Sequence, residues 1–106
     1  MIREVRVLRI ADRDLQRISD SIRIRVSDES AKRWNRKLLD AIEDLAISAD
    51  QHPEADEALM TGRDVRMRIV GKYRHIYRIL FSINAGVVIV HRVRHAAQDT
   101  LTEDDF

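Results

Sequence analysis

Basic side chains in the C-terminal half of the sequence are the ones whose types and spacing could do chemistry. Two short stretches, VGKYRHIYRIL and VVIVHRVRH, contain the six candidates: Lys72, Arg74, Arg78, Arg92, Arg94 and His95. Guanidinium groups form forked hydrogen bonds to phosphate or carboxylate, and histidine can donate a proton near neutral pH. The pattern therefore predicts an anion-binding surface. Phosphodiester cleavage is the reaction it could support, with His95 as the acid.

Charge is segregated along the chain, although the formal net charge of its 106 residues is only +1. Residues 40–57 hold seven acids and no Lys or Arg, whereas residues 58–98 hold eight cations and one acid, Asp64. A tail at about residues 99–106 is acidic again. A basic block in a near-neutral chain indicates a local anion-seeking surface. High genomic GC content is a simpler explanation for the preference for Arg over Lys, and it stays open.

Composition and length limit the classes of protein to consider. The chain fits a single domain, residues 1–106. It has no cysteine, which excludes disulfides and thiolate metal sites. The four histidines form no metal-binding motif and the three glycines are isolated, so we expect no metal and no cofactor. No segment resembles a signal peptide or a membrane span, and we expect a cytoplasmic protein that does not bind membranes.

Two helices are predicted in the first half of the chain. Apolar residues recur three and four apart in ADRDLQRISDSIRIRV, which indicates an amphipathic helix with Asp12 as its N-cap. A second apolar stripe fills residues 31–49, in a longer helix that begins at Ser27 or Asp28 and ends before Pro53. Only a few residues connect the two helices, so they should form an antiparallel hairpin.

Four strands are predicted from short apolar runs and from alternation: residues 4–10, 65–70, 73–83 and 87–95. Gly71 should make the tight turn before the third strand, and Asn84 to Gly86 the hairpin before the fourth. A polar segment, residues 54–62, leads from the helices to the last three strands. The order β-α-α-β-β-β predicts an α+β fold, with the helical hairpin packed on one face of a small, mainly antiparallel sheet.

The same alternation leaves a set of arginines for the face opposite the helices. If the strand registers match, the set is Arg66, Arg68, Arg74, Arg78, Arg92 and Arg94. Guanidinium groups packed together without partners repel one another, so an anionic ligand, a protein partner or the acidic tail is expected nearby. A solvated face, on which arginine stems cover apolar surface, would explain the pattern as well.

The sequence resembles the toxins of the RelE/ParE superfamily, from bacterial type II toxin–antitoxin modules, and is most similar to the ParE branch. The resemblance covers almost the whole chain, in the stretches ADRDLQRISDSI, SAKRWNRKLLDAIEDLA, RMRIVGKYRHIYRI and VVIVHRVRHAAQD. Its most specific part is GKYRHIYRI followed by VHRVRH. The resemblance implies a RelE/ParE-like fold over the single domain.

For the ParE branch, the resemblance implies a plasmid-stabilising toxin that inhibits DNA gyrase, stops replication and arrests growth. A ParD-like or related antitoxin would neutralise it by folding onto it. Ile24, Trp34 and Leu39 are candidates for the apolar contact, and the alternative for each is an ordinary core position. An inhibitor of this kind needs no catalytic acid, so we expect that the chain is not an enzyme. The expected target-binding residues are Lys72, Arg74, Arg78, Arg92, Arg94 and His95.

For the RelE branch, the resemblance implies a metal-independent endoribonuclease that cuts mRNA on the ribosome. Arg74 matches the strand arginine that acts on the scissile phosphate, and His95 would be the acid. In-line attack by a 2′-hydroxyl needs a base, an acid and charge stabilisation together. This sequence has Ala96 and Ala97 where such enzymes continue with a basic pair, and residues 100–102 contain no tyrosine. The gyrase inhibitor is therefore the favoured interpretation.

Overall fold

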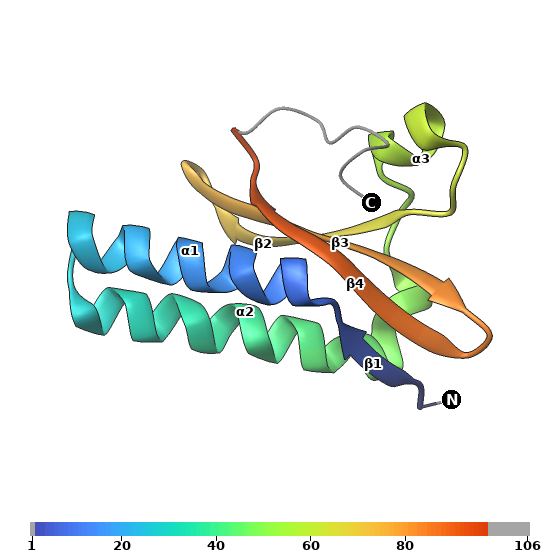
Figure 1. The fold of residues 1–106 in the computed structure, drawn as a ribbon, viewed down its shortest axis with the longest axis horizontal. Coiled ribbons are helices and arrows are strands. Elements are labelled where there is room, and N and C mark those ends of the chain that lie inside the picture. Colours follow the sequence, from blue (N-terminus) through green and yellow to red (C-terminus); the bar gives the residue numbers. More distant parts are fainter. Residues whose placement is uncertain (1, 98–106) are drawn as a thin grey trace.

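The computed structural model describes residues 2–97 as one sheet with helices on both faces (Figure 1). In chain order the elements are β1 (Glu4–Val7), α1 (Arg9–Arg25), α2 (Asp28–Ser48), the 3₁₀ turn η1 (Ala49–Gln51), α3 (Asp56–Thr61), β2 (Arg66–Lys72), β3 (His75–Asn84) and β4 (Val87–His95). The predicted acidic tail, about residues 99–106, lies outside the described residues.

The sheet has four strands in the order β1-β4-β3-β2. β1 pairs with β4 in parallel, and the other neighbours are antiparallel. α1 and α2 form an antiparallel hairpin on one face, and the short α3 lies on the other side of the sheet (Figure 1). The predicted α+β architecture is confirmed. The sequence did not predict α3, which forms within the polar segment 54–62.

Two apolar clusters hold these layers together. The larger one lies between the helical hairpin and the sheet, where Leu38, Leu45, Ile79 and Phe81 are fully buried. The smaller one lies on the outer face, where α3 and its flanks cover part of β2 and β3: Ala55, Ala58, Val65 and Leu80, with Met67 packed against them. The outer face is therefore not an open surface along its whole length.

Among the three α-helices of the described residues, only α2 begins at a side-chain N-cap. The hydroxyl of Ser27 accepts a hydrogen bond from the backbone N–H of Ser30 at 3.1 Å, which confirms Ser27 as the N-cap of α2. The prediction of Asp12 as the cap of α1 is wrong. α1 begins at Arg9 with Leu8 at the N-cap, and Asp12 lies in the first turn, where its charge still favours the helix dipole. β1 consequently ends at Val7 instead of reaching residue 10.

Gly71 lies inside β2, which corrects its prediction as a turn residue. Its φ is +101°, and an added Cβ would lie 1.9 Å from the carbonyl oxygen of His75. The turn falls two residues later, at Tyr73 (φ 59°) and Arg74. Arg74 is therefore a turn residue and does not belong to β3. The strand predicted over residues 73–83 begins at His75.

Replacing Gly71 by Ala should destabilise the fold much more than the same change at Gly62. Both glycines have positive φ, but nothing lies within 4 Å of a Cβ added at Gly62. Gly71→Ala should cost about 3 kcal/mol, since strain and overpacking each cost about 1–3 kcal/mol. Gly62→Ala should cost about 1 kcal/mol. Urea unfolding of the two variants measures the difference, and equal losses would contradict the close approach at Gly71.

Candidate functional site

Arg92 is the most deeply buried of the expected target-binding residues. Its Nε and Nη2 donate to the carboxylate of Asp14 on α1 at 2.8 and 3.0 Å. The same carboxylate accepts the backbone N–H of Val93 at 3.0 Å. The side chains of Arg92 and Asp14 are only 8% and 4% exposed. The expectation that Arg92 gathers with other arginines on an open face is wrong, because its guanidinium reaches α1 and links the helix to β4.

Arg66 and Arg68 lie on the helix face, which also corrects the predicted cluster. In the sheet register Arg68 stands opposite Ile79, whose side chain faces the helical hairpin. Arg68 Nη1 donates to the carboxylate of Asp44 at 2.7 Å and to the carbonyl oxygen of Ala41 at 3.0 Å. The Arg68 guanidinium holds the pKa of the Asp44 carboxyl below its usual value. Arg68 therefore fastens β2 to the polar side of α2.

Arg78 faces away from the helical hairpin, as predicted, but its guanidinium forms an ion pair with an acidic side chain on that face. Its Nη1 lies 3.1 and 3.0 Å from the two carboxylate oxygens of Glu57 on α3. Glu57 is fully buried and the Arg78 side chain is 13% exposed. A buried charge is tolerated when it is paired in this way. Because sequence periodicity does not reveal α3, this partner of Arg78 was not predicted.

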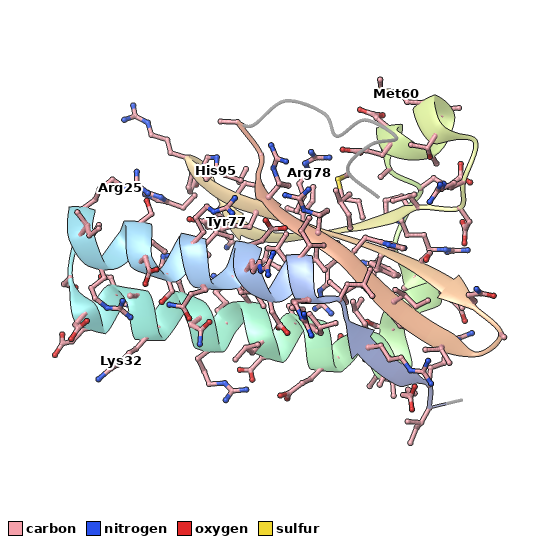
Figure 2. The ribbon with its side chains drawn as sticks, in the orientation of Figure 1. Arg25, Lys32, Met60, Tyr77, Arg78 and His95 are labelled. Atoms are coloured by element: carbon pink, nitrogen blue, oxygen red, sulfur yellow. The ribbon has the colours of Figure 1, made fainter. Side chains whose placement is uncertain are left out.

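A groove between α1 and the end of β4 is lined by two of the remaining predicted residues, Arg94 and His95. Its volume is about 460 Å³, and the acidic and basic residues that line it are Asp14, Arg17, Arg25, Arg92, Arg94 and His95. A second hollow of about 300 Å³ shares Arg25 and Tyr77 with the first. Figure 2 shows Arg25, Tyr77 and His95 along this side of α1. Because Asp14 already accepts from Arg92, the groove keeps a net positive charge.

His95 lies at the end of the groove with its ring against Tyr77, at a centroid distance of 5.2 Å. Its Nδ1 accepts a hydrogen bond from the backbone N–H of Ala97 at 3.0 Å. The ring proton is therefore on Nε2, which donates to the carbonyl oxygen of Arg74 at 3.0 Å. Both ring nitrogens thus bind the backbone. This arrangement orders the turn beside the groove and does not present an acid to a substrate.

Tyr77 forms part of the groove wall and packs against Trp34 and His95. Burial raises the pKa of the Tyr77 phenol, and the charge of Arg25 opposes that effect only in part. The phenol is therefore neutral near pH 7. Among residues 2–97, no group of His, Asp and Glu side chains is arranged to hold a metal ion.

Exposed residues lie at the end of β2 and in the turn that follows it, where the Arg74 carbonyl oxygen binds the groove residue His95. Lys72, Tyr73 and Arg74 are all exposed, and Tyr73 is 91% exposed. Of the apolar positions expected to meet a partner, Ile24 is 84% exposed, whereas Trp34 and Leu39 pack against the core. Within the part of the chain that the structure describes, no helix is long and apolar enough to cross a membrane.

Three arginines of the helices, Arg17, Arg25 and Arg33, line the two hollows and were not predicted as site residues. A signal for two of them is present in the sequence. Arg17, Ser21 and Arg25 are spaced four apart, which places them on one face of a helix. Alternation along the strands cannot reveal cations that the helices contribute.

Comparison with known proteins places this arrangement in a family. The chain matches the ParE toxin of type II toxin–antitoxin systems, parDE, over residues 5–100. It belongs to that family. No curated protein sequence matches it significantly.

Two solved structures share the fold at low sequence identity. The chromosomal ParDE toxin–antitoxin system of P. aeruginosa aligns with a TM-score of 0.73 and 16% identity, over 89% of this chain and 96% of that one. The RelBE2 toxin–antitoxin complex of Mycobacterium tuberculosis aligns with a TM-score of 0.62 and 19% identity, over 90% and 99%. At these identities the likeness concerns the fold alone.

Removing Glu57 should destabilise the protein strongly, because Arg78 would keep a buried charge without this partner. We expect Glu57→Ala to lower the free energy of unfolding by about 3–5 kcal/mol. Asp56→Ala, at the exposed neighbouring position of the same helix, should cost less than about 1 kcal/mol. Urea denaturation of both variants measures these losses. A cost for Glu57→Ala no larger than that for Asp56→Ala would show that the pair does not hold α3 on the sheet.

Proposed function

We propose that this chain is a toxin that inhibits DNA gyrase, thereby stopping replication and growth in the cytoplasm, and that a ParD-like or related antitoxin neutralises it. Membership of the ParE toxin family supports the class of protein. The fold is shared with the toxin–antitoxin systems of P. aeruginosa and Mycobacterium tuberculosis, which supports an antitoxin partner. A plasmid-stabilising role is the corresponding biological function.

One observation carries the choice of a binding function over a nuclease function. Three of the residues expected at the target-binding surface already have partners within the protein. Arg78 binds Glu57, Arg92 binds Asp14, and both ring nitrogens of His95 bind the backbone. General acid catalysis requires a proton donor directed at the leaving group. Arg74, exposed in a turn, supplies charge without an acid or a base.

The residues proposed to contact the target lie along the groove and at the turn beside it. Arg94 and His95 line the groove, and Lys72 and Arg74 are exposed at the turn. Arg78 supports this surface indirectly by holding α3, and Arg92 supports it by holding α1. An inhibitor needs charge and shape for binding, and neither requires a catalytic acid.

A supercoiling assay tests the proposal. The purified chain should block supercoiling of relaxed plasmid by gyrase and should leave translated mRNA intact in primer extension. Unchanged supercoiling at saturating protein would refute gyrase as the target, and new 5′ ends in the mRNA would establish the nuclease instead.

Arginine variants test the proposed contact residues. Arg74→Ala and Arg94→Ala should each weaken inhibition about tenfold or more, since a hydrogen bond to a charged group contributes about 1.5–3 kcal/mol. Their melting temperatures should stay close to that of the parent chain. Arg36→Ala is the matched control, because Arg36 is exposed on α2 and binds surface acids. A large loss of stability in the first two variants would make these arginines structural.

A further inference from the structure

Arginines that form no ion pair follow the groove from the helical hairpin to the end of β4. Among residues 2–97, the lining arginines of this kind are Arg17, Arg25, Arg33 and Arg94. Two of them donate to neutral groups: Arg25 Nε to the Ser21 carbonyl oxygen at 3.4 Å, and Arg33 Nη2 to the Ser30 hydroxyl at 3.3 Å. The groove therefore presents guanidinium groups whose charge is not neutralised locally.

Two arginines elsewhere on the same helices have acidic partners. Arg23 binds Asp20 and Asp28, and Arg36 binds Asp40 and Glu43. Both Arg23 and Arg36 lie outside the lining of the two hollows. Arg9 and Arg13 also lack an ion pair within the described part of the chain, but they lie outside both hollows. What distinguishes the groove is that four such arginines line two hollows that share Arg25 and Tyr77. A concave surface lined by cations concentrates anions from solution.

Arg94 adds a second observation that points to a ligand. Its Nε is buried and has no hydrogen-bond partner within the described part of the chain. Most buried polar groups in folded proteins are hydrogen-bonded, and an exception calls for an explanation. Arg94 lines the groove, so an oxygen atom of a bound anion could accept this hydrogen bond.

Aromatic rings lie near these cations, and one of them, Tyr73, is almost fully presented to solvent. Tyr77 and Trp34 line the second hollow, next to Arg25 and Arg33. Tyr73 lies at the turn between Lys72 and Arg74, is 91% exposed and has a φ of 59°. A positive φ at a non-glycine residue is strained and is common at binding sites. The strained turn holds the ring of Tyr73 out in solvent, where it can stack on another ring.

We propose that the groove and this turn bind a single strand of nucleic acid. The arginines would contact the phosphodiester backbone, and Tyr73 would stack on a base. Forked guanidinium groups suit phosphates and carboxylates alike, but rings placed between cations are typical of surfaces for single strands. An acidic peptide could neutralise the arginines, but it has no bases to stack on Tyr73. This proposal rests on the proposed function, because it states the chemical class of a ligand for the same target-binding surface.

Fluorescence anisotropy with a fluorescein-labelled twelve-residue oligothymidylate tests the proposal on the full chain, without gyrase. Binding should weaken as salt rises from about 50 to about 200 mM, because the protein releases counterions. The double variant Arg17→Gln, Arg25→Gln should bind about tenfold more weakly. Its dependence on salt should be shallower, by about 0.7 in the logarithmic slope for each phosphate that the variant no longer neutralises.

Arg9→Gln, Arg13→Gln is the matched control for this double variant. Both residues are exposed on α1, and both lie outside the two hollows. The control removes the same formal charge from the same helix. If position in the groove decides affinity, it should leave binding of the oligothymidylate within about twofold of the parent chain.

Tyr73→Ala separates stacking from charge. It should weaken binding of the oligothymidylate about tenfold, while binding of inorganic polyphosphate, which has no bases, should not change. Melting temperatures of all variants close to that of the parent chain would show that the fold is kept.

Further probes decide between sources of the anion. An oligouridylate that binds as tightly as the oligothymidylate would show that the groove contacts the phosphates and does not distinguish ribose from deoxyribose. Tighter binding of one of the two would identify RNA or DNA as the preferred strand. Three results would overturn the proposal: no binding at low salt, equal losses in the two double variants, or equally tight binding of a twelve-residue polyglutamate. Because gyrase is absent from the assay, failure here and failure of the supercoiling test are separate results.

Discussion

The carboxylate of Asp14 makes the contact on which the groove depends. β1 ends at Val7, which pairs with Val90, and α1 then runs beside the rest of β4. Asp14 accepts hydrogen bonds from the Val93 backbone and from two nitrogens of Arg92, so that one buried group ties the helix to the strand. Helix and strand are opposite walls of the groove. Their spacing therefore follows from this interaction.

Two kinds of arginine result from this arrangement. Arg68, Arg78 and Arg92 bind acids of α2, α3 and α1, and so fasten each helix to the sheet. The other arginines along the groove have no such partner among the described residues. A paired guanidinium in the interior contributes to structure, and removing its partner leaves a costly buried charge. Charges that remain along a concave surface are available to an anionic partner. Both kinds of arginine look alike in the sequence, and only the presence or absence of an acidic partner in the structure distinguishes them.

Much of the fold could be predicted because its signals are local. Apolar periodicity indicated the two long helices, Ser27 supplied a cap, and the bounds of β4 agree with the predicted strand. The face that each arginine occupies could not be predicted, since alternation along a strand does not say which side is covered. The covering element α3 is a helix of six residues, too short for a periodic signal. A bulge at Leu80 and Phe81 also moves Val93 onto the helix face.

The central claim is that Asp14 and Arg92 act as one unit, and a double-mutant cycle tests it most directly. Urea unfolding would be measured for Asp14→Ala, for Arg92→Ala and for the double variant. Each single change should cost about 3–5 kcal/mol, because it leaves a buried group without its partner. The double change should cost less than their sum by about 2 kcal/mol or more. Losses that add to within about 0.5 kcal/mol would contradict the account.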